Sequence, residues 1–397
     1  MDMFSRSRNI SVRQRPRPDY EAGGIRAGPF LVYPKVEISS EFNDNIYAAD
    51  AGETSDTILH LRPDLAIESD WSRSFAALFA RGSVNRHRDF GSEDRDEYAL
   101  GGLVRADVTR LSNLSLGAEF NSRFEPRTSS NTPLETVRPI ALDTATAFAA
   151  AAFTSGRIKL TGRADLRRFD YADGADLSGR IIDQDDRDRD VSSLLGRVDF
   201  ATSPDAAVFV QVTGNRRDYG RSGSLASPAR NSEGLETLVG AGFEVSAQVR
   251  GEIAVGSIRQ DFDNPAYADT ARFGGRAQLE YFPSQLTTVT LGAGRTVEDA
   301  TAPGAGGFVS TSGSFAVDHE LLRNVILNAR LTYALDRYEG VDREDARIAA
   351  SLGATYLVNR NLGVSASIST QRISSDGVDR ARDFRVNRLA ISLVTQF

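Results

Sequence analysis

Apolar and polar residues alternate along most of this chain, and its last nine residues show the pattern clearly. Leu389, Ile391 and Leu393 are separated by smaller or more polar residues, and the sequence ends on Phe397. A period of two residues places successive side chains on opposite faces of a β-strand. This stretch therefore predicts a strand with one large apolar face.

The same alternation recurs in segments of about 12 to 17 residues from Phe30 onward, with turn residues between them. Such segments are longer than typical strands of soluble proteins. About ten residues of a tilted strand span the hydrocarbon of a membrane, and the surplus extends beyond it. The predicted strands, about 18 in number, are 31–47, 55–69, 73–89, 96–110, 113–124, 137–153, 156–170, 187–202, 205–218, 233–246, 248–262, 270–282, 285–297, 308–319, 323–338, 344–357, 361–373 and 384–397.

The connections between these segments alternate between short and long. The long polar ones are 125–136, 171–186, 219–232 and 298–307. Tight turns on one rim and longer loops on the other are typical of membrane barrels. The short connections are Asp70-Trp71, Leu111-Ser112, Ser155-Gly156, Ser203-Pro204, Pro283-Ser284, Leu322-Arg323 and Asn359-Arg360.

A half-solvated sheet of a soluble protein gives the same alternation, so the pattern alone does not decide the fold. Its recurrence along the whole chain without helical segments favours a closed barrel, in which every backbone polar group is paired. We therefore expect an all-β fold, a transmembrane antiparallel up-and-down β-barrel of about 18 strands with both termini periplasmic. Residues 29–397 would form the barrel.

Aromatic residues gather near the segment ends. They could be ordinary core residues, but the barrel interpretation favours two girdles at the membrane interfaces. The residues are Phe42, Tyr47, Trp71, Phe90, Tyr98, Phe120, Phe153, Phe200, Tyr281, Tyr333, Tyr338 and Tyr356.

Composition narrows the function classes. The chain has 397 residues, no cysteine and a formal net charge of −7. It therefore offers no disulfide framework or thiolate metal site, and its charge argues against nucleic-acid binding. His60, His87 and His319 lie far apart and show no metal-ligand spacing. We expect no metal and no cofactor.

Residues 1–28 are polar and rich in arginine and proline. This composition predicts a disordered periplasmic lead-in. Met1–Arg8 lacks the apolar core of a signal peptide. Because an outer-membrane protein must be exported, we expect that the export signal lies upstream or has been removed.

Two N-terminal stretches carry a family resemblance. They are Pro34-Lys-Val-Glu-Ile-Ser-Ser-Glu-Phe-Asn-Asp-Asn-Ile-Tyr47 and Leu61-Arg-Pro-Asp-Leu-Ala-Ile-Glu-Ser-Asp-Trp-Ser-Arg73. They resemble the opening of the putative beta-barrel porin 2 family, and the lead-in and the closing strand fit as well. The resemblance implies a barrel in the bacterial outer membrane, and some members of the family are implicated in polysaccharide export. These motifs are structural, and a fold does not determine a function.

The resemblance and the last strand together imply partners. Outer-membrane lipid would surround the barrel, and the barrel-assembly machinery would read the C-terminal strand. A periplasmic polysaccharide-export protein would dock at the rim of short turns. The assembly-signal residues are Leu389, Ile391, Leu393 and Phe397.

Charged residues on the face opposite the apolar one are the candidate functional residues. An 18-stranded barrel is wide enough for an aqueous channel, and charges along its lumen would select solutes. Alternatively, they only solvate the lumen and pair across strands. The candidates are Arg157, Lys159, Arg163, Asp165, Arg167, Arg250, Glu252, Arg272, Arg276, Glu280, Arg330 and Asp336.

No catalytic constellation stands out, so we expect no enzyme. The acidic stretch Asp183–Asp190 lacks the glycine and closing glutamate of a calcium loop. It predicts a solvated loop, and Asn43-Asp44-Asn45 predicts a strand-end turn.

We expect an outer-membrane channel that conducts a secreted exopolysaccharide. The alternatives are a general diffusion porin for small hydrophilic solutes and a structural barrel with no conducting role.

Overall fold

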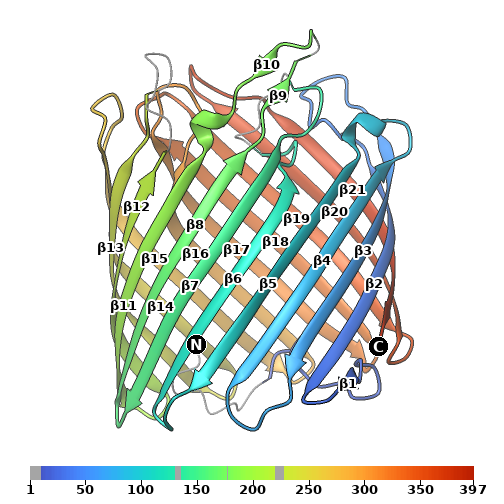
Figure 1. Ribbon diagram of the computed structural model, residues 1–397, viewed down its shortest axis with the longest axis vertical. Helices are drawn as coiled ribbons and strands as arrows, with labels where there is room; N and C mark the ends of the chain where they lie inside the picture. The colour runs from blue at the N-terminus through green and yellow to red at the C-terminus, as the bar shows by residue number, and fades with distance from the viewer. Residues whose placement is uncertain (1–9, 130–135, 177, 220–227) are drawn as a thin grey trace.

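In a computed structural model of the chain, the described residues are 10–129, 136–176, 178–219 and 228–397. They form a closed antiparallel β-barrel (Figure 1). The main sheet has 19 strands, but the three-residue β1 (Ile25–Ala27) pairs only with β2, so 18 strands close the ring. The prediction of an all-β barrel of about 18 strands is confirmed. In the described part of the chain, no helix is long and apolar enough to cross a membrane.

Each predicted strand corresponds to one observed strand of 13 to 16 residues. Strand β2 pairs with both β3 and β21, which closes the ring. The 18 strands are β2 (Phe30–Asn43), β3 (Asp56–Ser69), β4 (Phe75–His87), β5 (Arg95–Asp107), β6 (Ser112–Phe124), β7 (Ala141–Ser155), β8 (Ile158–Tyr171), β11 (Arg189–Ser203), β12 (Ala206–Asp218), β13 (Ser232–Ser246), β14 (Val249–Phe262), β15 (Thr270–Ser284), β16 (Thr287–Asp299), β17 (Gly307–Leu322), β18 (Val325–Tyr338), β19 (Glu344–Leu357), β20 (Leu362–Asp376) and β21 (Phe384–Gln396).

The two rims of the barrel differ as predicted. Connections such as Gly156-Arg157 are only two residues long, and they lie on one rim, here called the short-turn rim (bottom of Figure 1). Gly156 has a φ of +57°, which a tight hairpin turn requires and glycine adopts without strain. The longer connections lie on the other rim, the long-loop rim, where the small hairpin of β9 (Gly174–Ala175) and β10 (Ile181–Ile182) projects. Strand β2 begins and β21 ends on the short-turn rim.

Alternation along each strand separates an apolar outer face from a polar inner face. In β18, Leu331 and Tyr333 are 43% and 48% exposed on the outside, whereas Asp336 on the other face is fully buried. Packed apolar residues form small clusters near the long-loop rim, such as Ala48 with Ile373, Phe384 and Val386. The interior is therefore mainly polar.

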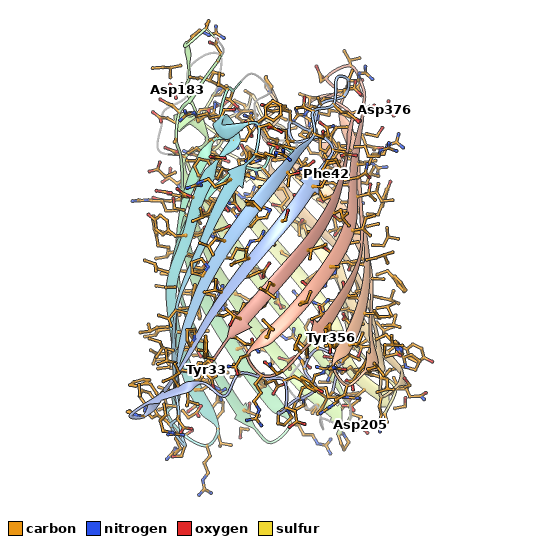
Figure 2. All side chains as sticks on the ribbon, turned by 90° about the vertical axis from the view of Figure 1, so that its right-hand side faces the viewer. Tyr33, Phe42, Asp183, Asp205, Tyr356 and Asp376 are labelled. Atoms are coloured by element: carbon orange, nitrogen blue, oxygen red, sulfur yellow. The ribbon has the colours of Figure 1, made fainter. Side chains whose placement is uncertain are left out.

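Outward aromatic side chains lie near both rims. Figure 2 shows Phe42 near the long-loop rim and Tyr356 near the short-turn rim. Both are 48% exposed. Tyr338, which we had grouped with them, is buried against Phe308 under a loop. The remaining exposed rings of the predicted set are Trp71, Tyr98, Phe120, Phe153, Phe200, Tyr281 and Tyr333.

The predicted assembly-signal residues lie on the outer surface. Leu389, Ile391 and Leu393 are 46–59% exposed on one face of β21, and Phe397 directly follows that strand. That the barrel-assembly machinery recognises these residues stays a prediction.

Candidate functional site

Side chains that meet across the interior identify the inward face of the barrel. Arg197 of β11 lies 2.8 Å from the Glu252 carboxylate of β14. Arg276 of β15 donates a hydrogen bond of 2.9 Å to the Gln211 side chain of β12. Because two strands separate the partners in each case, these contacts can form only inside the barrel.

Eleven of the twelve predicted lumen residues lie on strands, on this inward face. Arg157 differs, because β7 and β8 pair up to Ser155 and Ile158 and leave Gly156-Arg157 as the turn. The eleven inward residues are Lys159, Arg163, Asp165, Arg167, Arg250, Glu252, Arg272, Arg276, Glu280, Arg330 and Asp336.

Three inward phenylalanines each lie between a glycine of the neighbouring strand and an arginine. Phe209 of β12 faces Gly240 of β13, where an added Cβ would come within 2.4 Å of the ring. The Arg197 guanidinium lies 3.6 Å from the centre of the same ring. We call these sets the Gly–Phe–Arg units. The other two are Gly117, Phe148 and Arg163 (4.1 Å), and Gly101, Phe79 and Arg81 (4.3 Å).

The arginines of these units are also paired with carboxylates. Arg197 contacts Asp199 at 2.7 Å as well as Glu252, and Arg163 contacts Asp165 at 2.6 Å. Arg81 contacts Asp64 at 3.2 Å. The aromatic ring and the carboxylate together hold each guanidinium against the wall. Positive and negative charges of this wall therefore largely cancel.

Some inward cations lack such a partner. Among the described residues, no carboxylate lies within 4.0 Å of Lys159, Arg167 or Arg330. These three residues offer positive charge that a passing solute can contact.

The wall from β16 to β20 carries small hydroxyl side chains instead. The middle of this wall stands opposite the middle Gly–Phe–Arg unit, since β18 lies nine strands around the ring of 18 from β7, which carries Phe148. A cavity of about 770 Å³ lies along this wall, lined by Ser312, Ser314 and Thr332 and reached by Arg276 and Glu252. The predicted lumen residues are all charged and do not include the alternate serines of 310–314 and 365–369. The inward hydroxyl residues of this wall also include Ser310, Ser351, Ser365, Ser367 and Ser369.

The N-terminal segment crosses the short-turn mouth. Val12 is fully buried, and its N–H donates to the Thr288 hydroxyl of β16 at 3.0 Å. Arg13 contacts Asp318 at 2.8 Å, and the Tyr20 carbonyl accepts a hydrogen bond from Gln396 of β21. We call residues 11–20 the N-terminal strap.

The acidic partner of the strap is Glu320 of β17. Its carboxylate contacts Arg17 at 2.8 Å and Arg15 at 3.5 Å. Arg17 and Glu320 are both buried, so this contact is shielded from water. We expected a disordered lead-in, but residues 10–28 follow a defined path here, while residues 1–9 of that prediction lie outside the described residues.

Buried arginines link the loops of the opposite mouth. Arg127 contacts Glu93 at 2.7 Å, and Arg187 contacts Glu125 at 2.7 Å. Asp299 of β16 joins two further arginines of β11 and β12, Arg189 at 2.8 Å and Arg217 at 2.6 Å. The two Asp299 contacts narrow the long-loop mouth, because they join β16 to strands five and four positions away around the ring.

Two loop groups at this mouth have shifted pKa values. Burial, together with the neighbouring Arg127 guanidinium, lowers the pKa of Arg382 to about 10. Arg382 donates to the Tyr47 carbonyl at 3.1 Å and to the Arg127 carbonyl. Burial, and then the Asp299 carboxylate, raises the pKa of the Tyr219 hydroxyl above its ordinary value. Both groups keep one charge state at neutral pH.

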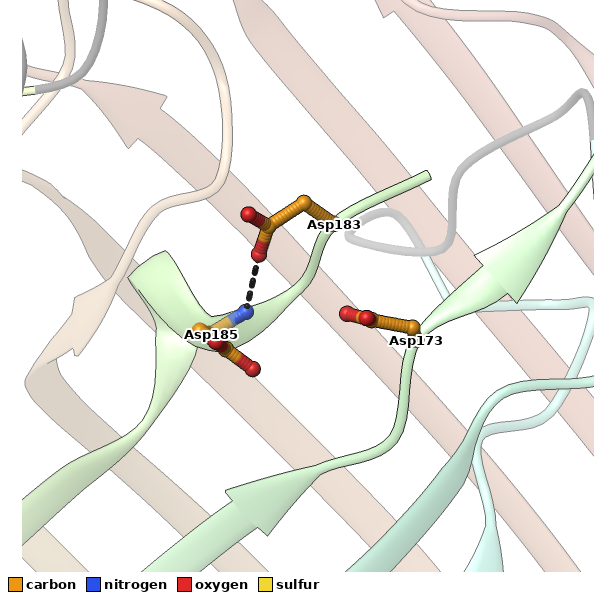
Figure 3. A group of neighbouring side chains, drawn as sticks. All are labelled: Asp173, Asp183 and Asp185. Carbon is orange, nitrogen blue, oxygen red and sulfur yellow. Dashed lines mark hydrogen bonds between the residues drawn. The ribbon is translucent and has the colours of Figure 1, made fainter. Parts of the chain in front are cut away.

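Three acidic side chains meet in the loop between β8 and β11 (Figure 3). Oxygens of Asp173, Asp183 and Asp185 lie within 4.8 Å of one another. Asp183 accepts the N–H of Asp185 at 3.0 Å, and Asp173 accepts the N–H of Gln184 at 3.0 Å. These bonds stabilise the loop backbone, and the start of the acidic stretch lies in a loop, as predicted.

The asparagines at the end of β2 also form hydrogen bonds with backbone groups. Asn43 accepts the N–H of Asn45 at 3.0 Å, and Asn45 bonds to Ala49 and to the Arg385 carbonyl. This is the predicted strand-end turn.

Comparisons with known proteins agree with this architecture. A family model described as "Putative beta-barrel porin 2" matches residues 17–397. Among solved structures, "Copper transporter OprC" has a TM-score of 0.50 at 10% identity, over 94% of this chain and 81% of that chain. Pseudomonas aeruginosa OccK2 (OpdF) has a TM-score of 0.50 at 11% identity, over 93% and 98%. No curated protein matches the sequence. At such identities the solved structures show the fold alone.

Proposed function

The chain belongs to the putative beta-barrel porin 2 family, and from this premise we propose that it forms an outer-membrane channel for hydrophilic solutes. The observation that carries the proposal is the contrast between the two faces of one closed sheet. Leucine, isoleucine and aromatic side chains cover the outside, and arginine, carboxylate and serine side chains cover the inside. In lipid, such a closed barrel leaves no backbone polar group unpaired.

We also propose an orientation for the channel in the membrane. Membrane barrels carry short periplasmic turns and longer extracellular loops. The short-turn rim, with both ends of the ring of strands, would therefore face the periplasm. A periplasmic partner would meet the N-terminal strap at this rim.

For the solute we propose a secreted exopolysaccharide. The support lies in the hydroxyl wall, since serine and threonine can exchange hydrogen bonds with successive sugar hydroxyls without holding any one of them tightly. The unpaired Lys159, Arg167 and Arg330 would attract acidic sugar units.

One observation favours a second candidate, a general diffusion porin for small solutes. The main lumen arginines are already neutralised by carboxylates of this chain, as in Arg197 with Asp199 and Glu252. A lumen with cancelling charges discriminates weakly between solutes.

The two candidates differ in how the channel responds to glycan. Single-channel conductance of the refolded protein is measured in a planar bilayer, with and without fragments of an acidic polysaccharide. Block by the fragments supports the export channel, and indifference supports the general porin. In cells, deletion of the gene abolishes extracellular polysaccharide in the first case only. A barrel that inserts without conducting would contradict both.

A further inference from the structure

Eight strand arginines point outward, toward the surrounding lipid in the proposed membrane setting. Five of them pair with a carboxylate beside them: Arg86 with Asp96, Arg168 with Asp190, Arg216 with Glu233, Arg259 with Asp261 and Arg337 with Glu344. Arg295 bonds to the Thr311 hydroxyl and the Phe273 carbonyl. Arg372 and Arg385 differ, because no carboxylate of the described chain lies within 4.0 Å of either guanidinium.

Arg372 and Arg385 are also directly opposite each other. They are Cα partners in the antiparallel pair β20–β21, and both side chains are exposed. Side chains at such positions have Cβ atoms about 4.5–5.5 Å apart, where like charges destabilise the sheet. Asp44, a carboxylate on the β2 side, is held by both the N–H and the side-chain amide of Asn387. An external anion between the two guanidinium groups would remove this repulsion.

The surroundings of the pair suit the headgroup region of a lipid. The next outward positions toward the short-turn rim are Thr370 and Asn387, followed by the exposed apolar Ile368 and Leu389. Four residues of strand separate Arg372 from Ile368, which is about 13 Å along the strand and on the order of 9 Å in height at a tilt of about 45°. Figure 2 looks onto this surface, with Asp376 at the end of β20 near the long-loop rim.

We propose that Arg372 and Arg385 form a binding site for the phosphate group of a phosphorylated glycolipid of the outer leaflet. Two guanidinium groups can each bind phosphate through two parallel N–H donors. The Thr370 hydroxyl lies where it can bond to a sugar hydroxyl, and the acyl chains run along Ile368 and Leu389. The assignment to the outer leaflet rests on the proposed function, in which the long-loop rim is extracellular.

The test compares lipid binding by two double variants in detergent, using native mass spectrometry. The variant R372Q/R385Q removes the proposed site. The control R86Q/R216Q removes two outward arginines that already have carboxylate partners. Each protein is titrated with bisphosphorylated lipid A, with the same lipid after dephosphorylation, and with phosphatidylglycerol.

We expect R372Q/R385Q to lose the tightest bound lipid A, with an affinity at least about tenfold lower than that of the wild type and the control. Dephosphorylated lipid A should bind the wild type as weakly as lipid A binds R372Q/R385Q. Equal binding of lipid A by the two double variants would overturn the site. If phosphatidylglycerol binds the wild type as tightly as lipid A does, and R372Q/R385Q loses both, the assignment to a glycolipid is overturned.

Channel activity separates this proposal from the proposed function. Both arginines point away from the lumen, so R372Q/R385Q should keep the single-channel conductance of the wild type. A wild-type protein that binds lipid A but never conducts would contradict the channel and leave the lipid site supported.

Discussion

Gly101, Gly117 and Gly240 each leave room for a phenylalanine ring on the neighbouring strand, and an arginine covers the ring from the other side. This arrangement keeps a bulky ring close to the barrel wall. Since the guanidinium then faces the lumen next to a carboxylate, the interior is polar even where its side chains are aromatic. Removal of the glycine should therefore disturb both the ring and the charge pair.

The first residue-scale prediction concerns Gly117. In Gly117→Ala the new Cβ lies 2.3 Å from the Phe148 ring, so the ring and Arg163 must move. Overpacking of this kind costs about 1–3 kcal/mol, and urea unfolding in detergent should show it. Gly162→Ala is the matched control, because nothing lies within 4 Å of its added Cβ. Equal stability of the two variants would contradict the packing described here.

The second residue-scale prediction concerns charge balance in the lumen. Arg197→Gln leaves Asp199 and Glu252 without their shared cation, so the channel should become more cation-selective. One uncompensated charge at about 4 Å in water is worth about 1 kcal/mol, which corresponds to at most about a fivefold rise in the cation-to-anion permeability ratio. Reversal potentials in a salt gradient measure this ratio. The outward Arg216→Gln should leave it unchanged.

At the scale of elements, the N-terminal strap lies across the short-turn mouth of the barrel. It is anchored by two acidic residues near the C-terminal end of one strand, Asp318 and Glu320 of β17, and it reaches Gln396 at the end of β21. The strap holds its place through charge-assisted contacts rather than through a continuous strand pairing. We therefore expect that its release from the mouth would leave the barrel folded.

Loss of both acidic anchors should release the strap. Hydrogen bonds to charged groups contribute about 1.5–3 kcal/mol each, so trypsin should cut D318N/E320Q after Arg13 at least about tenfold faster than the wild type. Arg15 and Arg17 each precede a proline, so trypsin cuts after neither of them. The single-channel conductance should rise at the same time. Asp96→Asn, which removes an exposed outward ion pair with Arg86, serves as the control. Unchanged cleavage in D318N/E320Q would show that the charges do not hold the strap.

For the whole molecule, the strand order and the faces could be predicted from sequence, since both depend on local alternation and on turn length. In the predicted strand 323–338, for example, Arg330 and Asp336 lie on the inward face of β18 as expected, whereas Leu331 and Tyr333 lie on the outward face. The same reliance on alternation explains the error at Arg157, which was predicted to face the lumen but lies in a turn. Alternation continues into the turn and does not mark where strand pairing stops.

Features that depend on distant strands could not be predicted in this way. The pairing of Phe209 with Gly240 requires the register between two strands, and the contact of Arg189 with Asp299 requires the curvature of the ring. The strap was missed because Arg-Pro-rich composition suggests disorder, whereas its partners Asp318 and Glu320 lie some 300 residues away in the chain.

The central claim is that the inward face lines a water-filled path through the membrane. The chain has no cysteine, so single cysteines can test it directly. Thr332→Cys places a thiol on the cavity wall, and Leu331→Cys places one on the outer face, one residue away. In a planar bilayer, a charged water-soluble thiosulfonate should reduce the conductance of Thr332→Cys in discrete steps and leave Leu331→Cys unchanged. Modification of Leu331→Cys with Thr332→Cys unaffected would contradict the assignment of the two faces.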